Sequence, residues 1–216
     1  MDRRSLSFRW PAIAACLALL SVPALGCKSG LESLTILYQG YDIPAEFDGL
    51  QGKKVVVVCK PLTEFSSQGV DRVLAEGISE RLKAHIKNIH IIEPEKVDKL
   101  RDKTGMDDYR QIGRALKAEK VIGIDIESFS VLDGQTLYKG RSTVSIQVYD
   151  VAEKQVEWHK APPQFEFPKI GSTPAQELPE VEFRNQFVAE LGEQIARFFY
   201  PHDRHDDYAS DISSTR

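Results

Sequence analysis

Two carboxylates lie two residues apart in a segment where apolar and polar residues alternate. In a strand, Asp125 and Glu127 would share one face and the isoleucines around them would share the other. Paired carboxylates can divide acid and base roles, so an enzyme of unknown class that uses this pair with a histidine is one hypothesis. The same pattern is typical of the solvent side of a half-buried strand. We therefore predict no catalytic residue and no enzymatic activity.

The end of the chain carries a second group of residues that could bind a metal ion. Two histidines and three aspartates fall close together, at His202, Asp203, His205, Asp206 and Asp207. Histidine and carboxylate are zinc ligands, which makes His202, Asp203 and His205 the metal candidates. The surrounding residues are polar, so 201–216 is predicted to be a disordered tail. We accordingly predict neither a metal site nor a cofactor.

The start of the chain has the order of a secretory signal. A basic beginning is followed by an apolar run over residues 11–22 and then by small residues up to Gly26 and Cys27. At ~1.5 Å per residue, a helix of this length is much shorter than the ~30 Å hydrocarbon core of a bilayer. We therefore predict that residues 1–26 are a signal peptide, cleaved between Gly26 and Cys27.

The cleavage site also resembles the lipobox of bacterial lipoproteins. In that motif the cysteine, here Cys27, is acylated with fatty acids such as palmitate and becomes the new amino terminus. Ala24 precedes Leu25 here, whereas a lipobox usually has leucine first, so plain secretion is the alternative. Lys28 follows where some bacteria use aspartate for retention at the inner membrane, which favours the outer membrane. The predicted attachment is to a membrane, through the lipid on Cys27.

Cysteine usage agrees with acylation. Cys16 leaves with the signal peptide and Cys27 carries the lipid, which leaves Cys59 as a free thiol. If Cys27 is not acylated, a disulfide between Cys27 and Cys59 becomes the alternative in an oxidising compartment. We interpret Cys59 as a buried strand residue. Residues 27–52, which are rich in turn formers, are predicted to be a tether.

Composition indicates an ordinary globular domain. The 216 residues carry a formal net charge of −4, with 42% hydrophobic and 28% charged residues. No basic face for nucleic acid is expected from this balance. The length left after processing suits one core, so residues 53–200 are predicted to form a single domain.

Hydrophobic periodicity predicts strands and helices in the first half of this domain. The run from Val55 to Val58 is typical of a central strand buried on both faces. An apolar residue at every fourth position over 70–86 predicts an amphipathic helix. The other elements expected here are a strand over 89–92, a helix over 94–105 and a helix that starts at 107 or 108.

The second half predicts an antiparallel meander and a final helix. Alternation over 121–130 and 143–149, with a third run over 156–158, indicates three hairpin-connected strands. Repeated prolines mark 162–179 as a connector within the domain. Apolar residues at every fourth position over 183–199 predict a helix packed on the sheet. The fold class is thus an α/β (α+β) sandwich, with a mixed sheet, the meander at one side and the C-terminal helix on the sheet.

Two aromatic residues of the meander are candidates for binding a partner. Tyr149 and Trp158 would contact another protein if they are exposed, because aromatic side chains often anchor interfaces. The alternative for Trp158 is packing against the last helix.

The order of elements resembles a family of bacterial envelope domains. The family includes the curli-secretion lipoproteins, the lipoprotein activators of penicillin-binding proteins and the amino-terminal domain of the Tol translocation protein. The resemblance covers about half of the chain and rests on residues 55–59, 82–100, 112–123 and 150–158. The last of these segments looks like the family's closing hairpin of aspartate, turn, apolar residue and tryptophan. It has Glu153 and Lys154 where a turn glycine is usual.

The resemblance implies a protein-binding or assembly role without catalysis. We therefore expect a lipid-anchored envelope protein that faces the periplasm and recruits another envelope protein through a sheet edge or the meander. The alternatives are the periplasmic enzyme that uses Asp125 and Glu127, and a homo-oligomeric component of secretion or assembly.

Overall fold

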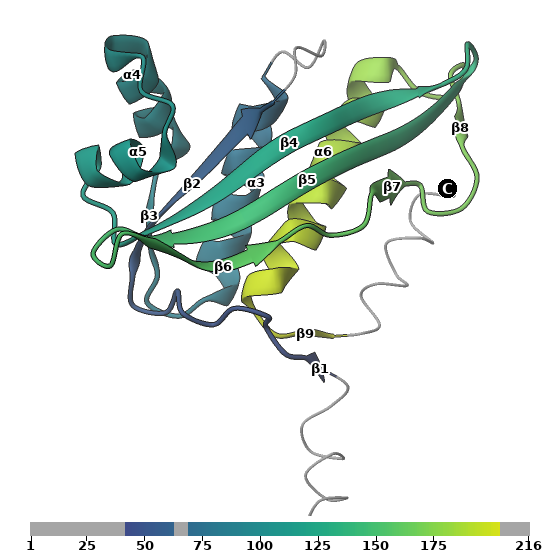
Figure 1. Cartoon of the computed structure of the whole chain (residues 1–216). Helices are drawn as coiled ribbons and strands as arrows, with labels where there is room; N and C mark the ends of the chain where they lie inside the picture. The colour runs from purple at the N-terminus through teal and green to yellow at the C-terminus, as the bar shows by residue number, and fades with distance from the viewer. Residues whose placement is uncertain (1–41, 63–68, 204–216) are drawn as a thin grey trace, which may run out of the picture. The chain divides into compact units, whose positions relative to one another are not determined.

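A mixed sheet organises the chain in the computed structural model, which describes residues 42–62 and 69–203. Its strands are β2 (Lys54–Pro61), β3 (His90–Ile92), β4 (Lys120–Asp133), β5 (Leu137–Asp150), β6 (Gln155–Lys160), β7 (Phe165–Phe167) and β8 (Thr173–Pro174). Five of them follow in the order β3-β2-β4-β5-β6, while β7 and β8 both pair with β5 (Figure 1). β2 is parallel to β3 and β4, and β4, β5 and β6 form the predicted antiparallel meander.

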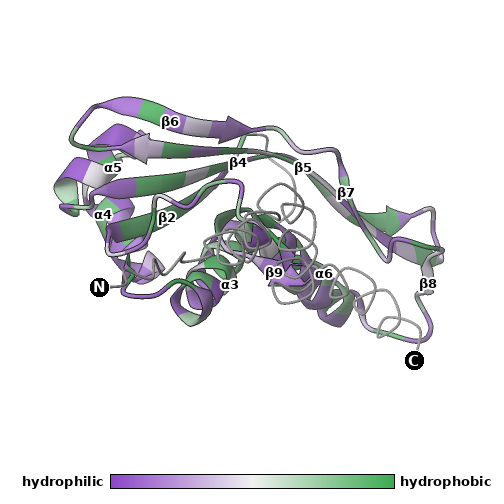
Figure 2. Ribbon diagram, turned by 90° about the horizontal axis from the view of Figure 1, so that it is seen from below, coloured by the Kyte–Doolittle hydropathy of each residue, from purple (hydrophilic) through white to green (hydrophobic). Residues whose placement is uncertain are grey.

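Two long helices cover one face of the sheet. They are α3 (Val70–His85) and α6 (Glu180–Ala196), which continues into the short 3₁₀ turn η1 (Arg197–Phe199). Figure 2 shows both helices on the same side of the sheet. Their apolar stripes include Leu74, Ile78, Phe183 and Phe187, each at most 1% exposed. Burial stabilises each such side chain by ~1.5–3 kcal/mol, so this layer is the main core.

Two shorter helices cover one end of the opposite face. They are α4 (Pro94–Thr104) and α5 (Tyr109–Ala115), which lie near β2 and β3 (Figure 1). Ile112 and Val97 pack there against Val56 and Val58, whereas Val55, Val57 and Cys59 of the same strand belong to the main core. Central burial of β2 on both faces is therefore confirmed. Together the two helix layers and the sheet confirm the predicted fold class.

The rest of that opposite face is not covered by a helix of the described residues. Figure 2 shows the sheet extending beyond α4 and α5 along β4 and β5. Thr143, Ser145 and Gln147 of β5 are half-buried there, between buried residues that point to the main core. We call the uncovered part of the sheet that displays these three side chains the open face.

Cys59 lies at the end of the buried run of β2. Its side chain is 2% exposed, and it is a free thiol within the main core. Burial raises the pKa of this thiol well above its ordinary value, so the thiolate is absent at neutral pH. The predicted buried strand cysteine is confirmed. Gly26 and Cys27 lie outside the described residues.

The folded part of the chain begins earlier than the sequence predicts. Residues 42–52, assigned to the tether, lie against the domain, and Leu50 is fully buried in the main core. Phe47 packs on Trp158 with ring centroids 6.2 Å apart. The surrounding glycines and proline indicated a linker, but burial of these two apolar side chains offsets the cost of ordering the segment.

The predicted tail also begins later than expected. His202 and Asp203 form β9 (His202–Asp203), which pairs with β1 (Asp42–Ile43) in a separate two-stranded ladder. The reason is that these two segments, far apart in the sequence, lie side by side and complete each other's backbone hydrogen bonds. Residues 204–216 lie outside the described part of the chain.

The connector over 162–179 is more ordered than its prolines suggested. β7 and β8 both add to β5, at Gly140–Ser142 and at Leu137–Tyr138. Phe167 contacts Phe183 with ring centroids 5.7 Å apart. Proline can occupy a sheet edge, which explains how this segment pairs with β5 while it crosses the surface.

Candidate functional site

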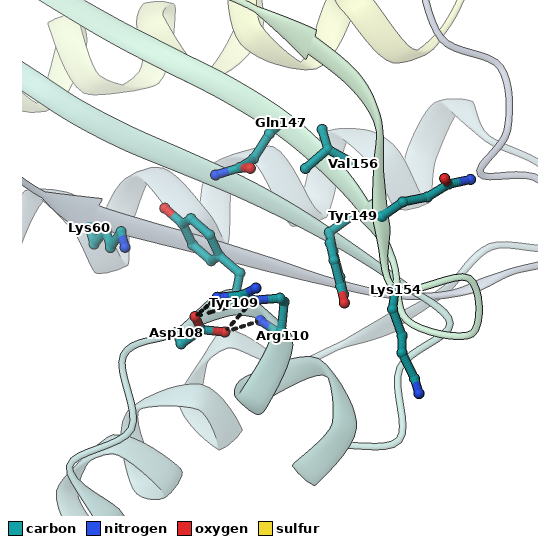
Figure 3. A pocket seen from close by; sticks show the side chains of 9 residues that line it. Lys60, Asp108, Tyr109, Arg110, Gln147, Tyr149, Lys154 and Val156 are labelled. Carbon is teal, nitrogen blue, oxygen red and sulfur yellow. Dashed lines mark hydrogen bonds and ion pairs between the residues drawn. The ribbon is translucent and has the colours of Figure 1, made fainter.

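A polar groove lies where the amino-terminal turn of α5 faces the meander. Its volume is about 310 Å³, and Figure 3 shows α5 residues on one side and residues of β5 and β6 on the other. Nine residues line it: Lys60, Asp108, Tyr109, Arg110, Gln147, Tyr149, Lys154, Gln155 and Val156. A second cavity of about 220 Å³ shares Asp108, Arg110, Tyr149 and Lys154 and adds Arg114. We call the two together the α5–meander groove.

Tyr109 is a buried wall of the groove. Its ring lies over Gly123 of β4, where a Cβ atom would come within 2.8 Å of the ring. Glycine is therefore needed at that strand position for the ring to lie flat on the sheet. The hydroxyl of Tyr109 donates to Asp125 Oδ1 at 2.7 Å. Burial and this carboxylate raise the pKa of Tyr109 far above its ordinary value, so the hydroxyl stays protonated.

Lys60 extends from the end of β2 over the same ring. Its Nζ lies 4.4 Å from the ring centroid of Tyr109 and 3.7 Å from Asp125 Oδ1. A cation over an aromatic face and beside a carboxylate is held by both, which fixes the ammonium at the side of the groove.

Asp108 caps α5 and fixes the position of Arg110. Its carboxylate accepts hydrogen bonds from the backbone N–H of Arg110 and Gln111, as predicted for a helix that starts here. The same carboxylate pairs with Arg110 Nη2 at 2.9 Å. The hydrogen bond from Arg110 lowers the pKa of Asp108 to about 2. The cap therefore stays charged at all physiological pH values.

A buried ion cluster fixes the hairpin that forms the other side. Lys120 Nζ lies 2.5 Å from Asp150 Oδ2 and 2.5 Å from Glu157 Oε2, and its side chain is only 7% exposed. Burial lowers the pKa of Lys120, but the bonds to both carboxylates outweigh it and the net shift is upward. Asp150 also accepts from the backbone N–H of Glu153 at 2.7 Å, which closes the turn before Lys154.

Lys154 occupies the turn in a left-handed conformation, with φ of 57°. Few non-glycine residues adopt this region, and lysine there carries a strain of order ~1 kcal/mol. Its side chain extends from the turn beside Tyr149 (Figure 3). Within residues 42–62 and 69–203, the side chains of Lys154 and Gln147 have no hydrogen-bond or ion-pair partner. The groove therefore presents donors that are not already used by the fold.

The predicted carboxylate pair is not assembled into a site. Asp125 is engaged by Tyr109 and Lys60 behind the groove, whereas Glu127 is exposed where a β-bulge interrupts the pairing of β4 with β5. No histidine among residues 42–62 and 69–203 lines the groove. His159, the histidine on β6, bonds through Nε2 to Ser145 Oγ at 3.0 Å. The residues that line the groove can bind and orient a ligand, but they include no nucleophile with an adjacent base.

The two aromatic candidates for partner binding lie in different places. Tyr149 is 6% exposed and lines the groove with one edge. Trp158 packs against Phe198 and Phe199, with ring centroids 6.2 and 5.5 Å away, so the alternative of packing near the last helix is what the structure shows for it. A role of either residue in partner binding stays a prediction.

Of the three metal candidates, His202 and Asp203 belong to the described residues and His205 does not. His202 Nδ1 lies 3.3 Å from the carbonyl oxygen of Tyr200, and Asp203 belongs to β9. His205 lies beyond the described residues. Across the part of the chain that the structure describes, no three or more His, Cys, Asp or Glu side chains are arranged to hold a metal ion. No helix in the same part is long and apolar enough to cross a membrane.

Sequence reasoning missed most residues of the groove. Lys60, Arg110, Gln147 and Lys154 come from four separate elements, and no motif links them. The one available signal was Lys154 itself, because lysine stands where the resembled family has a turn glycine. Tyr109 was predicted as a buried helix residue, which is correct, but its contact with Asp125 could not be foreseen.

Comparison with known proteins found similar solved structures only. No family model and no curated protein matches the sequence. A point variant of the PelC dodecamer from Paraburkholderia phytofirmans is 11% identical, with 69% of this chain and 93% of that chain covered and a TM-score of 0.42. A lipoprotein from Neisseria meningitidis is 12% identical, with 66% and 97% covered and a TM-score of 0.43. The LpoB C-terminal domain from Salmonella enterica is 11% identical, with 56% and 87% covered and a TM-score of 0.36.

These matches agree with the resemblance to envelope lipoprotein domains that the sequence predicted. Identities of 11–12% and TM-scores below 0.5 transfer no activity, substrate or partner to this chain.

Proposed function

We propose that this chain is a lipid-anchored protein of a bacterial envelope that faces the periplasm and binds another envelope protein without catalysis. The signal peptide is removed after Gly26, and the lipid is attached to Cys27. Lys28 favours the outer membrane as the site of the anchor. In this role the domain acts as a tethered adaptor.

The observation that carries the proposal is the open face with its groove. A sheet face left without a helix is unusual for a stable domain unless it is polar, and here Thr143, Ser145 and Gln147 make it polar. At its end, tyrosine and arginine side chains line the groove. These are residue types that are enriched in protein interfaces, which supports binding of a protein.

The composition of the groove argues against the enzyme alternative. Burial and the hydrogen bond to Asp125 raise the pKa of Tyr109 and keep it protonated, and the hydrogen bond from Arg110 lowers the pKa of Asp108 to about 2, so neither group has a pKa near neutrality. General acid–base catalysis needs a group with a pKa near the working pH. The lining residues supply binding groups instead.

The anchor is tested by mass spectrometry of the mature protein. We expect the amino-terminal peptide to begin at Cys27 and to carry fatty acids, and the Cys27→Ser variant to leave the membrane fraction. An unmodified cysteine at the mature terminus, or a retained leader, would refute the anchor.

Partner binding is tested by photo-crosslinking in cells. A photoreactive residue at Ser145, on the open face, should form a discrete adduct with another envelope protein. The control position is Glu80, an exposed residue on α3 at the other layer. Equal adducts from both positions would contradict a specific surface, and adducts between two copies of this chain would favour homo-oligomeric assembly instead.

A further inference from the structure

We infer that the α5–meander groove binds an acidic segment of a partner protein through its carboxylate groups. This inference rests on the proposed binding role and names the chemistry of the partner. It follows from the charge of the groove, its unused donors, the conformation of Lys154 and the volume of the two cavities.

The groove is cationic in a chain that is anionic overall. Lys60, Arg110 and Lys154 line the first cavity with one carboxylate, Asp108, and Arg114 lines the second. Asp125 lies behind the ring of Tyr109 and offsets part of the charge of Lys60. The whole chain carries a formal net charge of −4, so this local excess of positive charge is not a property of the average surface. Complementary charge steers association and selects partners.

Several donors in the groove are not used by the fold. The Gln147 amide and the Lys154 ammonium have no partner within the described ranges 42–62 and 69–203. The other cations are partly engaged: Arg110 pairs with Asp108, Lys60 lies beside Asp125, and Arg114 donates from Nε to the carbonyl oxygen of Arg110. The Tyr149 hydroxyl adds a donor beside Lys154 (Figure 3). Ammonium, amide and hydroxyl donors on one wall match the acceptor oxygens of carboxylates.

The conformation of Lys154 points the same way. Its φ of 57° is one that glycine adopts without strain, so the lysine occupies the turn at a cost in stability. Lys117 has nearly the same conformation, with φ of 54°, but lines neither cavity. The two lysines therefore form a matched pair for experiment.

The dimensions favour a peptide over a free anion. The two cavities of about 310 and 220 Å³ share residues and extend along α5, which is more room than one phosphate ion fills. Val156, 48% exposed, and the rings of Tyr109 and Tyr149 give the groove apolar surface. An ion would leave that surface unused, whereas a polypeptide segment contacts both the cations and the apolar wall.

The test uses the full chain, purified in detergent, and fluorescence anisotropy of labelled peptides. The probes are a glutamate-rich peptide, a peptide of the same length with glutamine in place of glutamate, and a lysine-rich peptide. We expect binding of the glutamate-rich peptide only, weakening as salt is raised. Inorganic phosphate and soluble short-chain phosphatidylglycerol serve as competitors.

Charge reversal at the matched lysines locates the binding. Lys154→Glu should lower the affinity for the glutamate-rich peptide ~5-fold, because a positive charge at the rim of the groove is lost and a repulsive negative charge is added. Lys117→Glu makes the same change outside the groove and should alter affinity less than ~2-fold. Adding Arg114→Glu to Lys154→Glu should weaken binding further, to ~20-fold.

Glycine at the same positions separates binding from stability. Lys154→Gly should raise the melting temperature by ~2 °C, because the backbone strain is relieved. It should also lower the affinity for the glutamate-rich peptide, because the positive charge is lost. Lys117→Gly should raise the melting temperature similarly with no change in affinity. A variant that is more stable yet binds less well cannot be explained by misfolding.

Three results of the binding experiments would overturn the inference. They are equal binding of the glutamine and glutamate peptides, equal losses from Lys154→Glu and Lys117→Glu, and tighter binding of phosphatidylglycerol or phosphate than of the peptide. If the Ser145 crosslink to a partner persists in cells while the peptide does not bind, the adaptor role stands and only the acidic specificity fails. Loss of self-association in Lys154→Glu, seen by light scattering, would identify a second copy as the occupant and also overturn the inference.

Discussion

The two faces of the sheet differ in the residues that they display. The face under α3 and α6 is continuous and apolar, with Ile122, Ile124 and Ile126 of β4 at most 1% exposed. The other face has a small apolar cluster beneath α4 and α5 and then the polar open face. Most of the buried apolar side chains therefore lie in one layer, which leaves part of the other face free to carry a binding surface. Substitutions on the two faces should therefore have very different costs.

The largest effect is expected at Phe187 on the covered face. Its ring stacks on Phe129 with centroids 5.1 Å apart and lies so close to Gly140 that a Cβ atom there would be 2.4 Å from it. Phe187→Ala should lower the free energy of unfolding by about 3–5 kcal/mol, because transfer and cavity costs add. Denaturant unfolding followed by circular dichroism measures this. A loss below ~1 kcal/mol would contradict the main core as described.

A smaller loss in the free energy of unfolding is expected at the ion cluster of Lys120, Asp150 and Glu157. Lys120→Met leaves the carboxylates of Asp150 and Glu157 without their cation, and these side chains are 13% and 27% exposed. We expect a loss of about 2–3 kcal/mol, less than for a fully buried pair because water reaches both carboxylates. The pKa of Asp150, now held below its ordinary value by Lys120, should rise in the variant. Asp150→Asn in the same background should recover part of the stability, and an added loss instead would exclude this explanation.

The sequence predicts the covered face better than the open one. Four-residue spacing in α3 and α6, and alternation in the meander, follow directly from the need to bury apolar side chains, so Phe183, Phe187 and the isoleucines of β4 were all placed correctly. Leu50 and Phe47 were missed because two apolar residues among turn formers give no period.

The groove could not be predicted for a different reason. Its cations come from the end of β2, the start of α5 and the β5–β6 turn, and only the tertiary fold brings Lys60, Arg110 and Lys154 together. Asp125 and Glu127 are near each other in the sequence and formed the predicted pair, but a β-bulge at Glu127 and the hydrogen bond from Tyr109 to Asp125 give them separate surroundings. Binding surfaces made of single residues from many elements carry no local pattern.

The cap of α5 should respond to pH in a defined direction. Asp108 has an ordinary carboxyl pKa of 3.8 when unfolded and about 2 when folded, so its charge stabilises the fold above pH ~4 and this contribution disappears as the pH falls through 2. Asp108→Ala should cost about 1 kcal/mol at neutral pH through loss of the cap. Asp108→Asn keeps the acceptor oxygen and removes the charge. The stability difference between wild type and Asp108→Asn should therefore shrink between pH 5 and pH 2, and a constant difference would show that the charge is not involved.

The smallest effect is expected on the open face itself. Ser145 and its neighbour Val144 lie on the same strand, but Ser145 points to the open face and Val144, 1% exposed, points to the main core. Ser145→Ala removes one exposed bond to His159 and should change stability by less than ~0.5 kcal/mol. Val144→Ala should cost about 2 kcal/mol, since burial is lost and a cavity forms. Equal losses in the free energy of unfolding at these adjacent residues would mean that side chains on both faces stabilise the fold. The residues of the open face would then be needed for stability and not free to form a binding surface.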